Sequence, residues 1–346
     1  MIFEEVRAGG GCYSYLIGCA ESCSAALVDP ELSQVDRYLA LLARAGLRLR
    51  YVVDTHTHAD HFSAARVLAG RLDVPTVMHR ANPAPYVDVR VDDGETLIVG
   101  RLRLRVLHTP GHTDDSICLA LPDRVLTGDT LLRLGTGRTD LPTGDPEAMH
   151  ESLFGKLLGL GDTVEVYPAH NYKATPVTTI GREKAENPRL RQRDRAAFVE
   201  QMQALNLEMP EHLTEALRTN RTGGKTVAQL LDEAASHISF MSMDEVRDRI
   251  QAGDRSLVIL DVRERDAYGE GHVPGARHLP RGQLELRVDR ELTDPTARIL
   301  TCCEFGKIST LAAATLRAMG YTRAVALDGG MKAWREAGFP LERTPG

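Results

Sequence analysis

Several metal-binding side chains lie close together in one short segment of the chain. His56, His58, Asp60 and His61 form an H-x-H-x-D-H motif. Imidazole and carboxylate ligands at this density suit zinc or iron. A histidine that binds a metal uses one ring nitrogen and needs a hydrogen-bond acceptor for the other, so the motif also predicts polar neighbours behind the rings.

Three further candidate ligands each follow a separate apolar run. They are His112 in Pro-Gly-His-Thr, Asp129 in Thr-Gly-Asp-Thr and His170 in Pro-Ala-His-Asn. The ends of strands on a rigid sheet commonly hold catalytic groups. The sequence therefore predicts a metal site built from several strand ends.

A second reactive segment lies near the end of the chain. Cys302 and Cys303 follow an apolar run that predicts a strand, and a helical pattern follows them. Inward-pointing backbone N–H groups and a helix N-terminus both favour a thiolate in such a loop. A thiolate held there is suited to carry a sulfane sulfur as a persulfide. The loop residues after Cys303 are Glu304, Phe305, Gly306, Lys307, Ile308 and Ser309.

Short strands and amphipathic helices must position these residues. Apolar runs and alternating patterns predict strands at 25–28, 49–53, 101–107, 124–126 and 164–167. Helical spacing predicts helices over 35–45 and 63–72, and a helical extension from 178 to 236. A strand–loop–helix pattern restarts near residue 240 and predicts a small α/β domain with a parallel sheet. We therefore expect two domains, at 1–237 and 238–346.

The composition is that of an ordinary globular protein. The chain has 346 residues, of which 42% are apolar and 5% aromatic, and its formal net charge is −6. These values do not favour nucleic-acid binding, which needs a basic face or stacking platforms. No apolar run reaches the ~20 residues that span a bilayer, and no signal peptide is evident, so we expect a cytoplasmic protein without a membrane partner. The cysteines outside the loop are predicted to be inert: Cys12, Cys19, Cys23 and Cys118.

Residues 1–235 resemble the metallo-β-lactamase superfamily, and within it the persulfide dioxygenases, with the glyoxalase II hydrolases as near relatives. The histidine motifs carry the resemblance, together with the segments 135–140, 170–173 and 183–190. It implies an αββα sandwich with a metal in a cleft at the strand ends. His56, His112 and Asp129 would hold one Fe(II) per chain as a two-His-one-carboxylate triad. The site-lining residues would be His58, Asp60, His61 and His170, which in the hydrolases help to complete a dinuclear site.

The same resemblance implies a reaction. The first domain would oxidise glutathione persulfide with O₂ and water to sulfite and glutathione. Glutathione is anionic, and the candidates for binding its carboxylates or backbone are Arg138, Tyr172 and Lys173.

Residues 240–346 resemble a rhodanese domain. Its signature segments occur in the expected order at 260–263, 271–276, 327–330 and 333–334. The family loop C-x-x-G-x-R-S aligns Cys303 with the nucleophile and puts Ile308 at the usual arginine position. The domain would transfer sulfane sulfur among thiosulfate, glutathione persulfide and sulfite. Because Ile308 lacks the guanidinium fork of an arginine, we expect thiosulfate to bind weakly.

Two other functions remain open at this point. All ligand positions of a dinuclear centre are filled, so the first domain could instead be a zinc thioester hydrolase of the glyoxalase II type. The cysteine loop could also belong to a sulfur-carrier module that only relays persulfide to a partner. The sequence leaves the oligomeric state open, a homo-oligomer included.

Overall fold

The computed structural model describes residues 1–172, 175–292 and 294–343. The chain divides into two compact units, Met1–Gly224 and Lys225–Gly346, and each is described by itself. The expected boundary at 237/238 would put helix α7 (Val227–Ser236) in the first unit. In the structure α7 contacts α11 (Lys307–Ala318) of the second unit.

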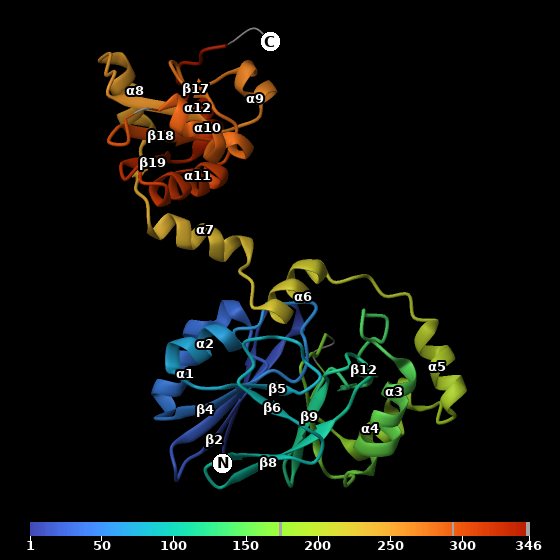
Figure 1. Cartoon of the computed structure of the whole chain (residues 1–346). Helices are drawn as coiled ribbons and strands as arrows, with labels where there is room; N and C mark the ends of the chain where they lie inside the picture. Colours follow the sequence, from blue (N-terminus) through green and yellow to red (C-terminus); the bar gives the residue numbers. More distant parts are fainter. Residues whose placement is uncertain (173–174, 293, 344–346) are drawn as a thin grey trace. The chain divides into compact units, whose positions relative to one another are not determined.

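Two six-stranded sheets form the centre of the first unit (Figure 1). The first sheet has the order β1-β2-β3-β4-β5-β6 and the second the order β14-β13-β10-β9-β8-β7. The strands of the first are β1 (Ile2–Arg7), β2 (Tyr13–Cys19), β3 (Ser24–Val28), β4 (Arg48–Val53), β5 (Thr76–His79) and β6 (Val89–Val91). Those of the second are β7 (Thr96–Val99), β8 (Leu102–His108), β9 (Ile117–Ala120), β10 (Arg124–Gly128), β13 (Glu165–Pro168) and β14 (Thr178–Thr179). A separate ribbon joins β11 (Leu131–Leu132) and β12 (Gly135–Thr136).

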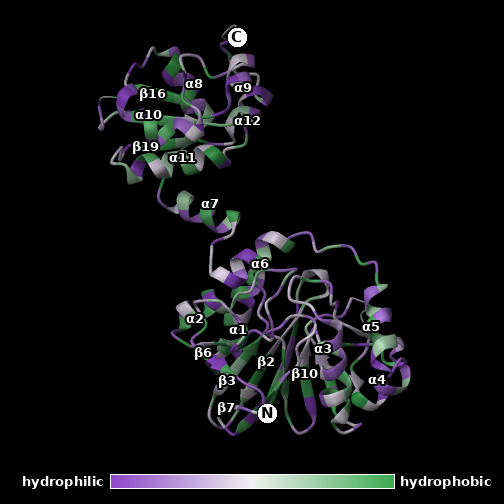
Figure 2. Cartoon of the chain, turned by 45° about the vertical axis from the view of Figure 1, so that its right-hand side comes forward, coloured by the Kyte–Doolittle hydropathy of each residue, from purple (hydrophilic) through white to green (hydrophobic). Residues whose placement is uncertain are grey.

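Helices cover the outer face of each sheet, which confirms the αββα sandwich (Figure 1). One buried cluster lies between the sheets and includes Ile17, Leu104 and Leu119. A second joins the first sheet to its helices, and a third joins the second sheet to its own. Figure 2 shows apolar residues concentrated on the strands. The helices are α1 (Val35–Ala45), α2 (Ala65–Leu72), α3 (Pro146–His150), α4 (Ile180–Glu186), α5 (Arg195–Gln203) and α6 (Leu213–Thr222).

Strand ends deliver the candidate ligands to one site. The H-x-H-x-D-H motif follows β4, and Asp129 directly follows β10. His112 follows β8, and His170 follows β13. Because β10 pairs with β13 in parallel, Asp129 and His170 emerge side by side.

The second unit is built on a parallel five-stranded sheet of order β15-β19-β18-β16-β17. Its strands are β15 (Phe240–Met241), β16 (Leu257–Asp261), β17 (Arg277–His278), β18 (Arg298–Cys302) and β19 (Ala324–Leu327). Its remaining helices are α8 (Met243–Gln251), α9 (Arg265–Glu270), α10 (Leu284–Glu291) and α12 (Gly330–Glu336). Two buried clusters, one including Leu260 and the other Trp334, form its core. In the part of the chain that is described, none of the helices has the length and apolar character needed to cross a membrane.

Candidate metal centre and sulfur-transfer loop

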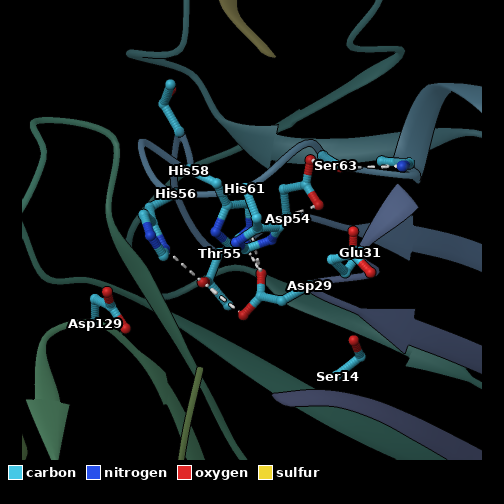
Figure 3. Close-up of polar contacts among 12 residues, drawn as sticks. Ser14, Asp29, Glu31, Asp54, Thr55, His56, His58, His61, Ser63 and Asp129 are labelled. Carbon is cyan, nitrogen blue, oxygen red and sulfur yellow. Dashed lines mark hydrogen bonds and ion pairs between the residues drawn. The ribbon is translucent and has the colours of Figure 1, made fainter. Parts of the chain in front are cut away.

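His56 lies in the loop after β4, and its neighbours determine which ring nitrogen is free. Thr55 donates its backbone N–H to Asp29 Oδ1 at 2.6 Å and its hydroxyl hydrogen to Asp29 Oδ2 at 2.9 Å (Figure 3). The hydroxyl oxygen can then only accept from His56 Nδ1, which lies 2.9 Å away. His56 Nε2 therefore carries a lone pair. It is buried and has no hydrogen-bond partner among the described residues.

His112 is oriented by a backbone carbonyl. Its Nδ1 lies 2.9 Å from the carbonyl oxygen of Arg138, which can only accept, so Nδ1 carries the hydrogen. The free Nε2 lies 3.5 Å from Asp129 Oδ2. Each of the two histidines thus presents a lone pair at Nε2 and donates the N–H behind it, as metal-binding imidazoles do.

His56, His112 and Asp129 form one buried group. A ligand atom from each lies within 4.8 Å of the other two. Burial, followed by the neighbouring His58, lowers the pKa of His56 to about 3, so this ring is neutral near pH 7. Burial alone would raise the pKa of Asp129, but the charge and hydrogen bond of His170 lower it overall. Two imidazoles and an ionised carboxylate are a donor set that suits Fe(II).

His170 bridges two carboxylates. Its Nδ1 lies 2.7 Å from Asp129 Oδ1, and its Nε2 lies 2.7 Å from Asp60 Oδ2. Burial opposes a charge on the ring, yet the two carboxylates together raise the pKa of His170 well above its ordinary value. Each ring nitrogen thus lies within hydrogen-bond distance of a carboxylate.

A second group of possible ligand atoms comprises Cys12, Asp60, His61 and His170. Cys12 Sγ lies 3.3 Å from His170 Nε2, and 3.8 Å from both His61 Nδ1 and Asp60 Oδ2. Cys12, which was expected to be an inert thiol, thus lies among the polar side chains of the site. Cys12 pairs with His170 across a β-bridge between distant parts of the chain, and nothing in the local sequence signals that pairing.

The other histidines of interest lie to the sides of these groups. His58 is fully buried, and its Nε2 lies 3.3 Å from Asp29 Oδ1. His108, for which the motif offers no role, donates Nε2–H to the carbonyl oxygen of Asp114 at 2.9 Å. Its ring stacks on His79 with centroids 3.7 Å apart, and it belongs to none of the groups of ligand atoms found among the described residues.

A cavity of about 1150 Å³ opens at the metal-ligand group, and His112, Asp129, Asp60 and His61 line it. The expected substrate residues Arg138 and Tyr172 line the same cavity. Lys173, also expected there, lies outside the described residues. The volume is slightly above the roughly 300–1,000 Å³ that is typical of small-molecule pockets.

Two arginines of the cavity wall differ in whether their guanidinium groups have hydrogen-bond partners. Arg138 donates to both carboxylate oxygens of Asp140, at 2.6 and 2.8 Å, and to the carbonyl oxygen of Glu208 at 2.7 Å. Arg189 also lines the cavity, and its guanidinium has no hydrogen bond or ion pair among the described residues. Burial lowers the pKa of Arg189. Sequence reasoning noted the Asn-Pro-Arg-Leu segment but did not single out this arginine as a ligand-binding residue.

Cys303 begins the loop between β18 and α11. Its side chain is 1% exposed. The Ser309 backbone N–H donates to Cys303 Sγ at 3.2 Å, and Ser309 Oγ lies 3.3 Å from the sulfur. Gly306 has a φ of 81° and turns the loop toward α11. Backbone and hydroxyl groups at the start of a helix thus face the sulfur, as a thiolate requires.

Cys302 is the last residue of β18 and has a different environment. It is fully buried, and burial raises its pKa well above the ordinary value. A thiol in that state is a poor nucleophile near neutral pH. Of the two adjacent cysteines, Cys303 has the surroundings of a nucleophile. Beyond it, Phe305, Lys307 and Ile308 are exposed.

Comparison with known proteins identifies both units. The metallo-beta-lactamase superfamily model matches residues 7–170, and the rhodanese-like domain model matches residues 242–337. The persulfide dioxygenase ETHE1 of Bos taurus, a mitochondrial protein, is 37% identical over 215 residues, which cover 61% of this chain and 84% of the relative. A hydroxyacylglutathione hydrolase of Anaeromyxobacter dehalogenans is 39% identical over 175 residues, covering 50% of this chain and 67% of that protein.

A solved structure agrees with the first of these relatives. The crystal structure of ETHE1 from Myxococcus xanthus is 43% identical, with a TM-score of 0.63, and covers 65% of this chain and 100% of that one. The match to the persulfide dioxygenases therefore extends over most or all of their length, and the rhodanese-like match lies within the second unit. The chain belongs to the persulfide dioxygenase family of the metallo-beta-lactamase superfamily and carries a rhodanese-like domain after it.

Proposed function

We propose that the first unit oxidises glutathione persulfide to sulfite with a single non-haem Fe(II), and that the second unit transfers sulfane sulfur at Cys303. In the first reaction one glutathione persulfide, one O₂ and one water give glutathione and sulfite. The observation that carries this proposal is the convergence of three metal-ligand atoms, His56 Nε2, His112 Nε2 and Asp129 Oδ2, beside a large cavity.

The donor set fits iron. His56 Nε2 is a buried lone pair without a partner among the described residues, as expected of an atom that binds a metal. His56, His112 and Asp129 would hold the ion and leave positions open for other ligands. When bound, iron would supply the redox chemistry with O₂ and a positive charge for the persulfide sulfur.

The residues around the ligands keep them in place. Thr55 holds the ring of His56, and the carbonyl of Arg138 holds that of His112. His170 donates to Asp129 Oδ1 and so directs the other oxygen of that carboxylate toward His112. Such partners orient metal ligands and raise metal affinity.

The dinuclear hydrolase is the second candidate function. Cys12, Asp60, His61 and His170 form another group of ligand atoms within 4.8 Å of one another, and one relative is named a hydroxyacylglutathione hydrolase.

Glutathione recognition would rest on the cavity wall. Arg189 has an unpaired guanidinium there among the described residues and is our candidate for a glutathione carboxylate. Tyr172, whose ring stacks on His170 at 5.1 Å, would contact the peptide. Arg138 would mainly fix the backbone at Glu208 by its hydrogen bond to that carbonyl oxygen, because the guanidinium group of Arg138 is already paired with the Asp140 carboxylate.

Replacing a ligand tests the assignment. His56→Ala, His112→Ala or Asp129→Ala should each remove iron and oxygen uptake, since two remaining ligands are too few to hold the metal. Sulfur transfer at Cys303 should persist, because the second unit has its own core. The measurements are metal content and oxygen uptake with glutathione persulfide. Full iron and normal uptake in any one of the three variants would reject the ligand set.

A further inference from the structure

The carboxylate of Glu304, the residue after Cys303, forms ion pairs with two arginines. Glu304 forms an ion pair with Arg335 of α12, and Arg335 Nη1 lies 3.3 Å from Glu304 Oε2. The same oxygen lies 3.3 Å from Arg263 Nη1. Arg263 also binds Asp261, at 2.6 Å between Nη2 and Oδ2. Two guanidiniums and two carboxylates thus neutralise one another beside the sulfur-transfer loop.

This pairing leaves little positive charge at the loop. Without Glu304, the fork of Arg335 would be free, and Arg263 would keep Asp261 and the carbonyl oxygen of Gly271. Within the described part of the chain, Lys307 is the one loop cation, and it has no ion pair there. A flexible ammonium group is a weaker ligand for a compact oxyanion than a guanidinium fork.

The exposed residues of the loop are largely apolar. Phe305 is 64% exposed and Ile308 is 48% exposed. Both are large side chains without a polar atom, and they lie on either side of the helix start in the loop that Cys303 begins. A neutral, apolar rim around a buried thiol suits an organic donor better than a small dianion.

We propose that Glu304 selects the sulfur donor at Cys303, disfavouring thiosulfate as a donor and favouring organic persulfides. The inference rests on the proposed sulfur transfer. The Cys303 thiolate attacks the outer sulfur of the persulfide, the S–S bond breaks, and the released thiolate takes the proton. Sulfite then attacks the outer sulfur on Cys303, which forms thiosulfate and returns the cysteine thiolate. The neutralised arginines also let the dianionic product leave.

Glu304→Gln tests the proposal in the full chain. The variant frees Arg335 and removes one of the carboxylates that neutralise Arg263, so the KM for thiosulfate should fall by a factor on the order of ten, the scale of one charge-assisted contact. The gain should shrink as ionic strength rises, because salt screens exposed charges. Glu304→Asp keeps the charge and should restore the wild-type preference. Glu336→Gln is the matched control. Glu336 lies on α12, the helix that carries Arg335, and its ion-pair partner is Lys332.

A second variant keeps the test decisive if Glu304→Gln does not fold. Arg335→Gln removes one cation and leaves Glu304 partly unpaired, so the KM for thiosulfate should rise. An unchanged KM for thiosulfate in each of the two variants that folds, with sulfur transfer from glutathione persulfide to sulfite intact, would overturn the role of Glu304. Absence of transfer from any donor in the wild-type chain would instead overturn the proposed function of Cys303.

Discussion

At the scale of single residues, the chemistry of the first unit depends on partners that the motif does not contain. The motif supplies His56, but Thr55 and Asp29 determine that Nδ1 carries its hydrogen and that Nε2 is free. His112 depends in the same way on a carbonyl oxygen from Arg138. The residue types predicted a group of metal ligands, and His56, His112 and Asp129 do lie together in the structure. The tautomers were not predictable, because Asp29 and Arg138 are distant in the sequence from the histidines they affect.

Thr55→Val should weaken iron binding without removing a ligand. The valine cannot accept from His56 Nδ1 or donate to Asp29, so the ring loses its fixed orientation. Loss of such a partner costs about 10- to 100-fold in metal affinity. Competition with a chelator measures the effect, and Thr222→Val, at an exposed position of α6, is the control. Equal iron affinity in the two variants would show that Thr55 does not position His56.

Cys303→Ser should abolish sulfur transfer and spare oxygen uptake with added glutathione persulfide. A serine hydroxyl does not ionise near neutral pH and cannot hold a persulfide. Cys302→Ser should have a much smaller effect, because Cys302 is buried with a raised pKa. Mass spectrometry after treatment with the persulfide locates the added sulfur. Its appearance on Cys302 would show that the alignment of the loop is shifted by one residue.

At the scale of elements, periodicity predicted the regular segments well and tertiary contacts shifted their ends. The helix expected over 35–45 occurs at those residues and ends at Gly46, which has a φ of 63°. The helix expected over 63–72 begins at Ala65, because Ser63 pairs with Glu31 across a β-bridge and its hydroxyl accepts from the Ala65 N–H. The helical pattern expected after Cys302 and Cys303 forms a helix that begins at Lys307, directly after the left-handed Gly306.

The loop of Cys303 is held against α12 by a glycine contact. Met331 N–H donates to the Cys303 carbonyl at 2.8 Å, and Lys332 N–H to that of Glu304 at 3.0 Å. A Cβ on Gly330, which has a φ of +66°, would lie 2.7 Å from both carbonyl oxygens. Sequence reasoning included this glycine in a signature segment but could not show which backbone it meets.

Gly330→Ala should therefore impair sulfur transfer. The new methyl group must push the loop away, and a displacement of about 1 Å at a catalytic group can cost roughly a hundredfold in rate. Gly253→Ala is the matched control, because Gly253 has a φ of +68° but open space around its Cβ position. Steady-state transfer rates and melting temperatures of the two variants give the comparison. Equal transfer rates would show that the contact does not hold the loop.

At the scale of the whole molecule, two units with separate cores carry two different reactions of sulfur compounds. Among the described residues, four buried clusters belong to the first unit and two belong to the rhodanese-like unit. The two-unit organisation and the αββα fold were predictable, because motif order and strand–helix alternation are properties of the sequence. The proposed reactions connect the units chemically, since sulfite from the first is the acceptor in the second.

The central claim is that the first unit is an iron-dependent persulfide dioxygenase. It is tested most directly on the full chain, purified without added metal, by measuring metal content and oxygen uptake with glutathione persulfide on the same sample. The account predicts one iron per chain and oxygen uptake matched by sulfite formation, because His56, His112 and Asp129 form a two-His-one-carboxylate group of ligand atoms. Two zinc ions per chain and no oxygen uptake would contradict it and favour the thioester hydrolase.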